Sequence, residues 1–114
     1  MSKIVYNCQA AEIDIIVTAG DTLNRTFAVQ KNGSDYNLDG LRLDMKIKRP
    51  DGSTLRTLSS VTSPADLGIS GNEFTIFTAP IVGQANYLYD VQVTDGDEVY
   101  TIQKGKIIVE QQQT

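Results

Sequence analysis

The sequence predicts an all-β protein, a sandwich or a small barrel, that encloses one hydrophobic core. Three observations lead to this prediction. Apolar and polar residues alternate over several short segments, turn signals recur about every ten residues, and no long segment has helical periodicity. A chain of 114 residues fits a single domain, which we place at residues 12–110.

The chain opens with a polar segment that holds one short apolar run, Ile4, Val5 and Tyr6. Residues 1–11 are therefore predicted to form an N-terminal arm or a first edge strand. The first full strand is expected over residues 12–18, where apolar side chains occupy alternate positions. A turn follows, and a strand over residues 22–30 carries Arg25 on an otherwise apolar face.

The middle of the chain reads as strands joined by tight turns. The pair Asn32 and Gly33 is typical of a hairpin, because both residues tolerate positive φ. Residues 41–48 alternate most regularly, and the turn at Pro50, Asp51 and Gly52 leads to a short strand over residues 54–58. The Ser/Thr/Pro-rich residues 59–68 are expected to be an irregular, mobile connection.

The last part of the chain predicts the longest hairpin. A brief strand is expected at residues 68–70, a longer strand at 72–79, and a bend or single helical turn at 80–84. Residues 85–109 then spell two alternating strands around an Asp-Gly-Asp-Glu turn, with four inward residues on the first of them: Tyr87, Tyr89, Val91 and Val93. Residues 111–114 are expected to fray.

Composition excludes several classes of function. The formal net charge of −4 and the pI near 4.6 argue against a nucleic-acid partner, which needs a basic surface. The absence of histidine removes imidazole-dependent triads and most zinc sites. A single cysteine, Cys8, cannot form an internal disulfide, so we expect synthesis in a reducing cytoplasm. No signal peptide or membrane-spanning run is recognised.

The acidic cluster Asp95, Asp97 and Glu98 is the one candidate for a metal site or for acid and base catalysis together with Asp90. A hydrated turn explains these carboxylates better, since the alternating oxygen donors of a full calcium loop are absent. We therefore predict no catalytic residue, no cofactor and no metal.

Two further groups of side chains suggest binding. Lys104 and Lys106 flank Gly105 on one face of the last strand, which indicates either a protected sheet edge or a contact with an acidic partner. The five tyrosines could form a sugar-stacking platform, although packing within the sheet is the simpler interpretation. They are Tyr6, Tyr36, Tyr87, Tyr89 and Tyr100.

Most of the chain resembles small β-sandwich proteins and domains of tailed bacteriophages. The resemblance lies in a Gly-Asp-Thr step at residues 20–22, a Leu-Asp-Gly step at 38–40, the Asp-Gly turn at 51–52, the segment 87–95 and the final strand 105–109. The pattern is similar to the immunoglobulin-like N-terminal domain of baseplate upper proteins and to short virion proteins. It implies an immunoglobulin-like β-sandwich of about seven to eight mostly antiparallel strands.

The resemblance also implies a role. It suggests a non-enzymatic structural subunit of a virion, synthesised in the host bacterial cytoplasm and acting by protein–protein docking as a symmetric homo-oligomer. The chain ends soon after the last strand, which favours a stand-alone adaptor, decoration or fibre-anchoring subunit, at the tail, the baseplate or a head fibre, over a connector that links two baseplate parts. Other virion proteins are the expected partners, and neither nucleic acid nor membrane is expected. The candidate interface residues are Ile4, Val5, Tyr6, Lys104 and Lys106.

Two alternatives remain: a carbohydrate-binding adhesion module, and a cellular immunoglobulin-like interaction domain.

Overall fold

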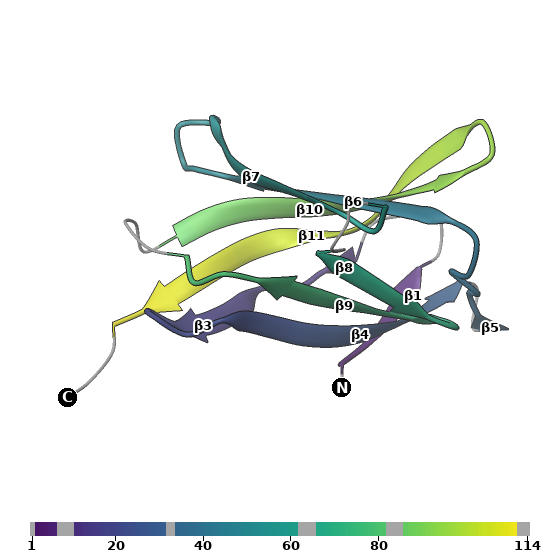
Figure 1. Cartoon of the computed structure of the whole chain (residues 1–114), viewed down its shortest axis with the longest axis horizontal. Coiled ribbons are helices and arrows are strands. Elements are labelled where there is room, and N and C mark those ends of the chain that lie inside the picture. The colour runs from purple at the N-terminus through teal and green to yellow at the C-terminus, as the bar shows by residue number, and fades with distance from the viewer. Residues whose placement is uncertain (1, 7–10, 32–33, 62–65, 82–85, 112–114) are drawn as a thin grey trace.

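The protein consists of two β-sheets packed face to face around a common core (Figure 1). The computed structural model describes residues 2–6, 11–31, 34–61, 66–81 and 86–111. These residues contain eleven strands and no helix. The all-β prediction is therefore confirmed, although the strands outnumber the expected seven to eight.

The first sheet has the strand order β1-β4-β9-β8, and β5 also pairs with β4. Its strands are β1 (Ser2–Tyr6), β4 (Leu23–Lys31), β5 (Ser34–Asp35), β8 (Leu67–Ser70) and β9 (Glu73–Thr78). All pairings are antiparallel except that of β1, which runs parallel to β4 at the edge of the sheet.

The second sheet has the order β2-β11-β10-β6-β7, and β3 also pairs with β11. Its strands are β2 (Ala11–Glu12), β3 (Ile15–Thr18), β6 (Arg42–Lys48), β7 (Thr54–Ser59), β10 (Asn86–Asp95) and β11 (Glu98–Glu110). The pairs β10·β11, β10·β6 and β6·β7 are antiparallel, whereas β2 and β3 run parallel to β11.

The core forms because each strand turns alternate side chains inward. On β6 the inward residues Leu43, Met45 and Ile47 are fully buried, as the alternation predicts. The predicted inward faces of β9 and β10 are buried as well. Phe27 of β4 and Phe74 of β9 pack with their ring centroids 5.5 Å apart. The strand pattern therefore translates directly into the interior of the sandwich.

The continuous strand expected over residues 12–18 is wrong. Its alternation is correct, since Ile15 and Val17 are buried and Ile16 is exposed. The strand is nevertheless broken into β2 and β3, because Ile13 and Asp14 leave the regular ladder as they pass Gly105.

The turns behave as their residues predict. Gly52 has a φ of 92°, and its amide donates to the carbonyl of Arg49. Asp95 pairs with Glu98 across the tip of the β10–β11 hairpin, where Gly96 has a φ of 63°. The irregular connection predicted over residues 59–68 is wrong at its two ends, because Ser59 ends β7 and residues 67–68 begin β8. Other predictions lie outside the described residues: those for Cys8, the Asn32-Gly33 pair, residues 62–65 of this connection, residues 82–84 of the predicted bend and residues 112–114 of the tail.

Candidate docking surface

The outer face of the second sheet brings together charged residues from β6, β10 and β11. Leu88 of β10 lies between Lys48 of β6 and Lys106 of β11 in the strand register. One step along the sheet, Asp90 lies between two further lysines in the same way. These are Lys46 and Lys104. Because directly opposed residues in antiparallel strands share a face, four lysines surround one leucine and one aspartate.

The lysines differ in how far their charge is neutralised. Lys104 forms an ion pair of 3.8 Å with Glu12, and Asp90 separates Lys104 from Lys46 in the register. Within the described part of the chain, neither Lys48 nor Lys106 forms an ion pair. We call Lys48, Leu88 and Lys106 the basic row.

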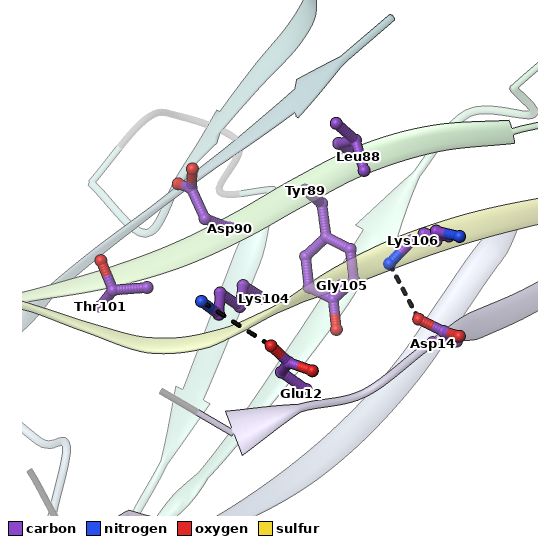
Figure 2. A pocket seen from close by; sticks show the side chains of 9 residues that line it. All are labelled: Glu12, Asp14, Leu88, Tyr89, Asp90, Thr101, Lys104, Gly105 and Lys106. Atoms are coloured by element: carbon purple, nitrogen blue, oxygen red, sulfur yellow. Dashed lines mark hydrogen bonds and ion pairs between the residues drawn. The ribbon is translucent and has the colours of Figure 1, made fainter. Parts of the chain in front are cut away.

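A shallow hollow of about 650 Å³ adjoins the basic row. Figure 2 shows Leu88 and Asp90 on β10, and Lys104 and Lys106 on the neighbouring β11. A second hollow of about 220 Å³ shares Leu88 and Lys106 with the first. Leu88 is 47% exposed, so the row offers an apolar contact between two ammonium groups.

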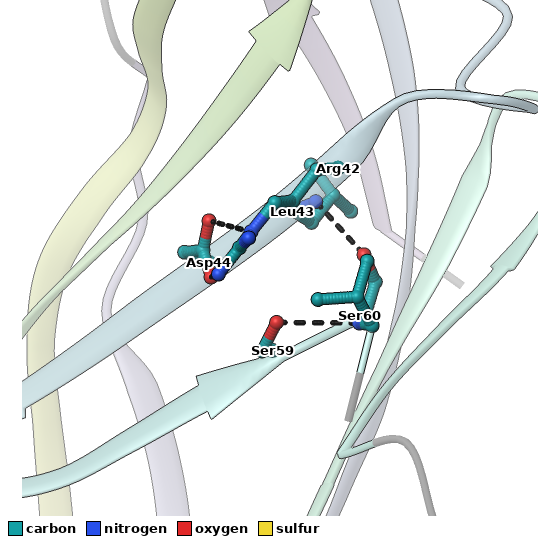
Figure 3. Close-up of polar contacts among 6 residues, drawn as sticks. Arg42, Leu43, Asp44, Ser59 and Ser60 are labelled. Carbon is teal, nitrogen blue, oxygen red and sulfur yellow. Dashed lines mark hydrogen bonds and ion pairs between the residues drawn. The ribbon is translucent and has the colours of Figure 1, made fainter. Parts of the chain in front are cut away.

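The far end of the same face is occupied by a local ion pair. Arg42 donates from Nε to Asp44 Oδ2 at 2.9 Å and from Nη2 to Oδ1 at 3.2 Å (Figure 3). This arginine is therefore matched by its own carboxylate. The free positive charge of the face lies at the basic row.

The acidic turn stands at the end of the β10–β11 hairpin, and we call residues 95–98 the acidic tip. Two of its carboxylates accept hydrogen bonds from tyrosines: Asp95 from the Tyr36 hydroxyl, at 3.4 Å, and Glu98 from the Tyr100 hydroxyl. Among the described residues, no group of three or more His, Cys, Asp or Glu side chains is placed to hold a metal ion. Val99, which follows the tip, is 58% exposed.

A buried polar network supports the face from inside. Register shifts between Val91 and Gln92, so that Ile102 and Gln103 of β11 both point into the core. Gln103 is fully buried and donates from Nε2 to the Tyr89 hydroxyl at 2.7 Å. Tyr89 donates in turn to the carbonyl of Ile13 at 2.6 Å. Burial raises the pKa of Tyr89 to about 12.

Gly105 allows the N-terminal segment to close against β11. A Cβ at this position would lie 2.2 Å from the carbonyl oxygen of Ile13. The same contact is held by hydrogen bonds from Ile13 N to Lys104 O, at 2.9 Å, and from Lys106 N to Asp14 Oδ1, at 3.1 Å. Figure 2 shows the latter bond beside the hollow. Glycine is therefore required here by close approach of two backbones.

The structure changes the interpretation of several predicted site residues. Lys104 and Lys106 do not mark a sheet edge, because β11 is paired on both sides and β2 and β3 form that edge. Tyr87 and Tyr89 are buried and cannot stack on a sugar. The backbone of Ile4, Val5 and Tyr6 belongs to β1 and pairs with β4.

Sequence reasoning missed Lys46, Lys48 and Leu88 as members of the surface. Their signal was present, because both lysines occupy the polar positions of the alternating segment 41–48. What could not be seen was that β6 and β11 flank the same strand.

No protein-family model matches the chain, and no curated protein shows significant similarity to it. No helix long and apolar enough to cross a membrane occurs in the part of the chain that the structure describes.

Proposed function

We propose that the chain is an immunoglobulin-like structural subunit of a bacteriophage particle, which acts by docking to other proteins and performs no catalysis. The observation that carries the proposal is the outer face of the second sheet. Lys48 and Lys106 flank the exposed Leu88, and Lys46 and Lys104 flank the neighbouring Asp90, on a sheet face beside an open hollow. Charged groups around an apolar contact are suited to selecting and orienting a protein partner.

Sheet topology supports the immunoglobulin-like part of the proposal. In that fold, strands B, E and D belong to one sheet, and strands C, F and G belong to the other. Taken in chain order, β4, β8 and β9 correspond to B, D and E, and they lie adjacent in the order β4-β9-β8. In the same way β6, β10 and β11 correspond to C, F and G, and they lie in the order β11-β10-β6.

The positions of the phage-like motifs support the fold that the resemblance implies. The Gly-Asp-Thr, Leu-Asp-Gly and Asp-Gly steps each supply a glycine with positive φ, at Gly20, Gly40 and Gly52. The remaining two motifs coincide with the paired strands β10 and β11. The steps that carry the resemblance are thus the turns and strands that organise the two sheets.

The test is to detect the protein in particles. Mass spectrometry of density-purified virions, from the phage whose genome encodes the chain, should find it as a stoichiometric component. Its absence from particles, while it accumulates in infected cells, would contradict the proposal. Saturable binding on a glycan array would instead support the carbohydrate-binding alternative, since a docking subunit should bind no sugar.

A further inference from the structure

The outer face of the second sheet continues from the basic row into a neighbouring row that carries no charge. Ile108 of β11 pairs with Asn86 of β10 on one side and with Ile16 of β3 on the other. Ile108 and Asn86 lie two residues along their strands from Lys106 and Leu88, so they face the same way, about 6.6 Å farther along the sheet. Ile16 is 50% exposed. We call Asn86, Ile108 and Ile16 the uncharged row.

The second hollow joins the two rows. It is lined by Leu88 and Lys106 from the basic row and by Asn86 from the uncharged row, and Pro50 and Tyr87 complete its wall. Its volume is about 220 Å³, whereas small-molecule sites usually enclose about 300–1,000 Å³. The hollow is therefore better matched to one apolar side chain of a partner than to a cofactor.

The positive charge beside this hollow is local. Lys48 and Lys106 stand on either side of Leu88, and neither forms an ion pair within the part of the chain that the structure describes. Two strand spacings separate the Cα atoms of these lysines, about 9.6 Å. The whole chain has a net charge of −4, so the rest of its surface repels an extended polyanion. A partner with a few carboxylates next to apolar side chains suits this surface better than nucleic acid or an anionic membrane.

We propose that the basic row, the second hollow and the uncharged row together bind an acidic segment of another protein. Its carboxylates pair with Lys48 and Lys106, and its apolar side chains contact the second hollow and the uncharged row. The inference rests on the proposed function, because it names the chemistry of the partner to which the subunit docks. Opposite charges beside an apolar contact favour one partner and one orientation.

An extended segment of alternating acidic and apolar residues has the required spacing. Successive carboxylates on one side of such a segment lie about 6.6 Å apart, and the apolar side chains lie on the other side. The Cα atoms of Lys48 and Lys106 are about 3 Å farther apart than these carboxylates. A lysine side chain is a flexible four-carbon stem, so the two ammonium groups can converge by this distance.

Three fluorescein-labelled peptides separate the contributions of charge and apolar contact. The first has the sequence Gly-Glu-Leu-Glu-Leu-Glu-Gly with blocked ends, the second replaces each Glu with Gln, and the third replaces each Leu with Ser. By fluorescence anisotropy the first peptide should bind saturably, and the other two should bind at least about fivefold more weakly. Raising NaCl from about 0.05 M to about 0.5 M should weaken binding of the first peptide, since salt screens exposed charges.

Charge reversal tests the two lysines. Lys48→Glu combined with Lys106→Glu should weaken binding of the first peptide at least about tenfold, because attraction is replaced by repulsion. Lys3→Glu with Lys31→Glu is the matched control. It changes the net charge equally but alters β1 and β4 of the other sheet, so the Kd should stay within about twofold of the wild-type value.

A second pair of variants tests the uncharged row. Ile16→Ser should weaken binding of the first peptide about threefold, because the exposed half of this side chain then no longer contributes apolar contact. Phe77→Ser is the matched control, since Phe77 is 56% exposed but belongs to β9 of the other sheet, and it should leave the Kd unchanged. Circular dichroism must show folded protein for every variant.

Four results would overturn the inference. The first is no saturable binding of the Glu-Leu peptide up to about 1 mM, and the second is equal affinity for the Glu and Gln peptides. The third is an equal loss of affinity in the lysine control, and the fourth is tighter binding of an oligothymidylate than of the Glu-Leu peptide. Detection of the chain in virions is independent of all four results, so the two proposals fail separately.

Discussion

Replacing Gly105 with alanine should strongly destabilise the fold, although only one methyl group is added. The new Cβ would lie 2.2 Å from the Ile13 oxygen and 2.8 Å from its carbonyl carbon, whereas ordinary contacts begin at 3.4 Å. The obstructing atoms belong to the backbone and cannot rotate away. The Ile13 carbonyl must therefore retreat by about 1.2 Å, the difference between 3.4 and 2.2 Å.

This retreat has a calculable cost. Movement of this size directly away from the Tyr89 hydroxyl lengthens its 2.6 Å hydrogen bond to Ile13 O to about 3.8 Å, beyond hydrogen-bonding range. Leaving a buried polar group unpaired costs about 1–3 kcal/mol, and overpacking costs about 1–3 kcal/mol more. Alanine also lowers the conformational entropy of the unfolded chain, which offsets about 0.4–1 kcal/mol of this destabilisation. We expect Gly105→Ala to lower the free energy of unfolding by about 3 kcal/mol.

Urea unfolding followed by circular dichroism and tyrosine fluorescence measures this loss, and no tryptophan masks the tyrosine signal. Gly68→Ala is the matched control, because Gly68 also lies within a strand but has open space where the alanine Cβ would lie. The control should change stability by less than about 1 kcal/mol. A Gly105→Ala variant as stable as this control would refute the close-approach argument.

Three further perturbations probe the remaining polar contacts. The folded state favours the neutral phenol of Tyr89, whose pKa is raised from 10 to about 12. The stability that this phenol contributes is therefore fully present below pH 10 and is lost as the pH rises towards 12. The urea midpoint should fall less over this pH range in Tyr89→Phe than in the wild type. Arg56 Nη1 of β7 donates a hydrogen bond to Thr78 Oγ1 of β9 at 2.7 Å. Arg56→Met should therefore lower the free energy of unfolding, measured by thermal melts, by about 1–2 kcal/mol. Arg56→Lys should retain only part of the stability that Arg56→Met loses. Hydrogen bonds from Ser53 lower the pKa of Asp51 below 3.8, so an NMR titration should find a low value in the wild type and a higher one in Ser53→Ala.

Much of the fold could be predicted because the alternation of apolar and polar residues within a strand indicates which of its faces is buried. The segment around Met45 shows this well, since residues two positions apart must point the same way in any extended chain. Hairpin turns were also predictable. The Asp95–Glu98 turn contains a glycine where positive φ is needed, and it joins the two strands that its sequence indicated.

Irregularities in the ladders could not be predicted in the same way. The break at Ile13 and Asp14 results from the approach to Gly105, a residue far away in the sequence. The register shift that turns both Ile102 and Gln103 inward depends on the pairing of β11 with β10. Periodicity alone assigns adjacent residues to opposite faces, so a bulge is invisible until the partner strand is known.

The candidate surface was predicted only in part, for the same reason. Lys104 and Lys106 were identified from their own strand, but their position was interpreted as an edge. Lys46 and Lys48 were assigned to the polar face of a different segment. Only the strand order places all four around Leu88 and Asp90.

The sequence by itself determined the all-β class, the inward residues of the main strands and the turn residues, because these depend on neighbours within a few positions. Only the tertiary structure decided the division into two sheets, the close contact at Gly105 and the meeting of lysines from β6 and β11. Those features depend on which distant strands pair. The pairing of distant strands depends on the hydrogen bonding and core packing of the whole chain. A local pattern of residues carries no information about it.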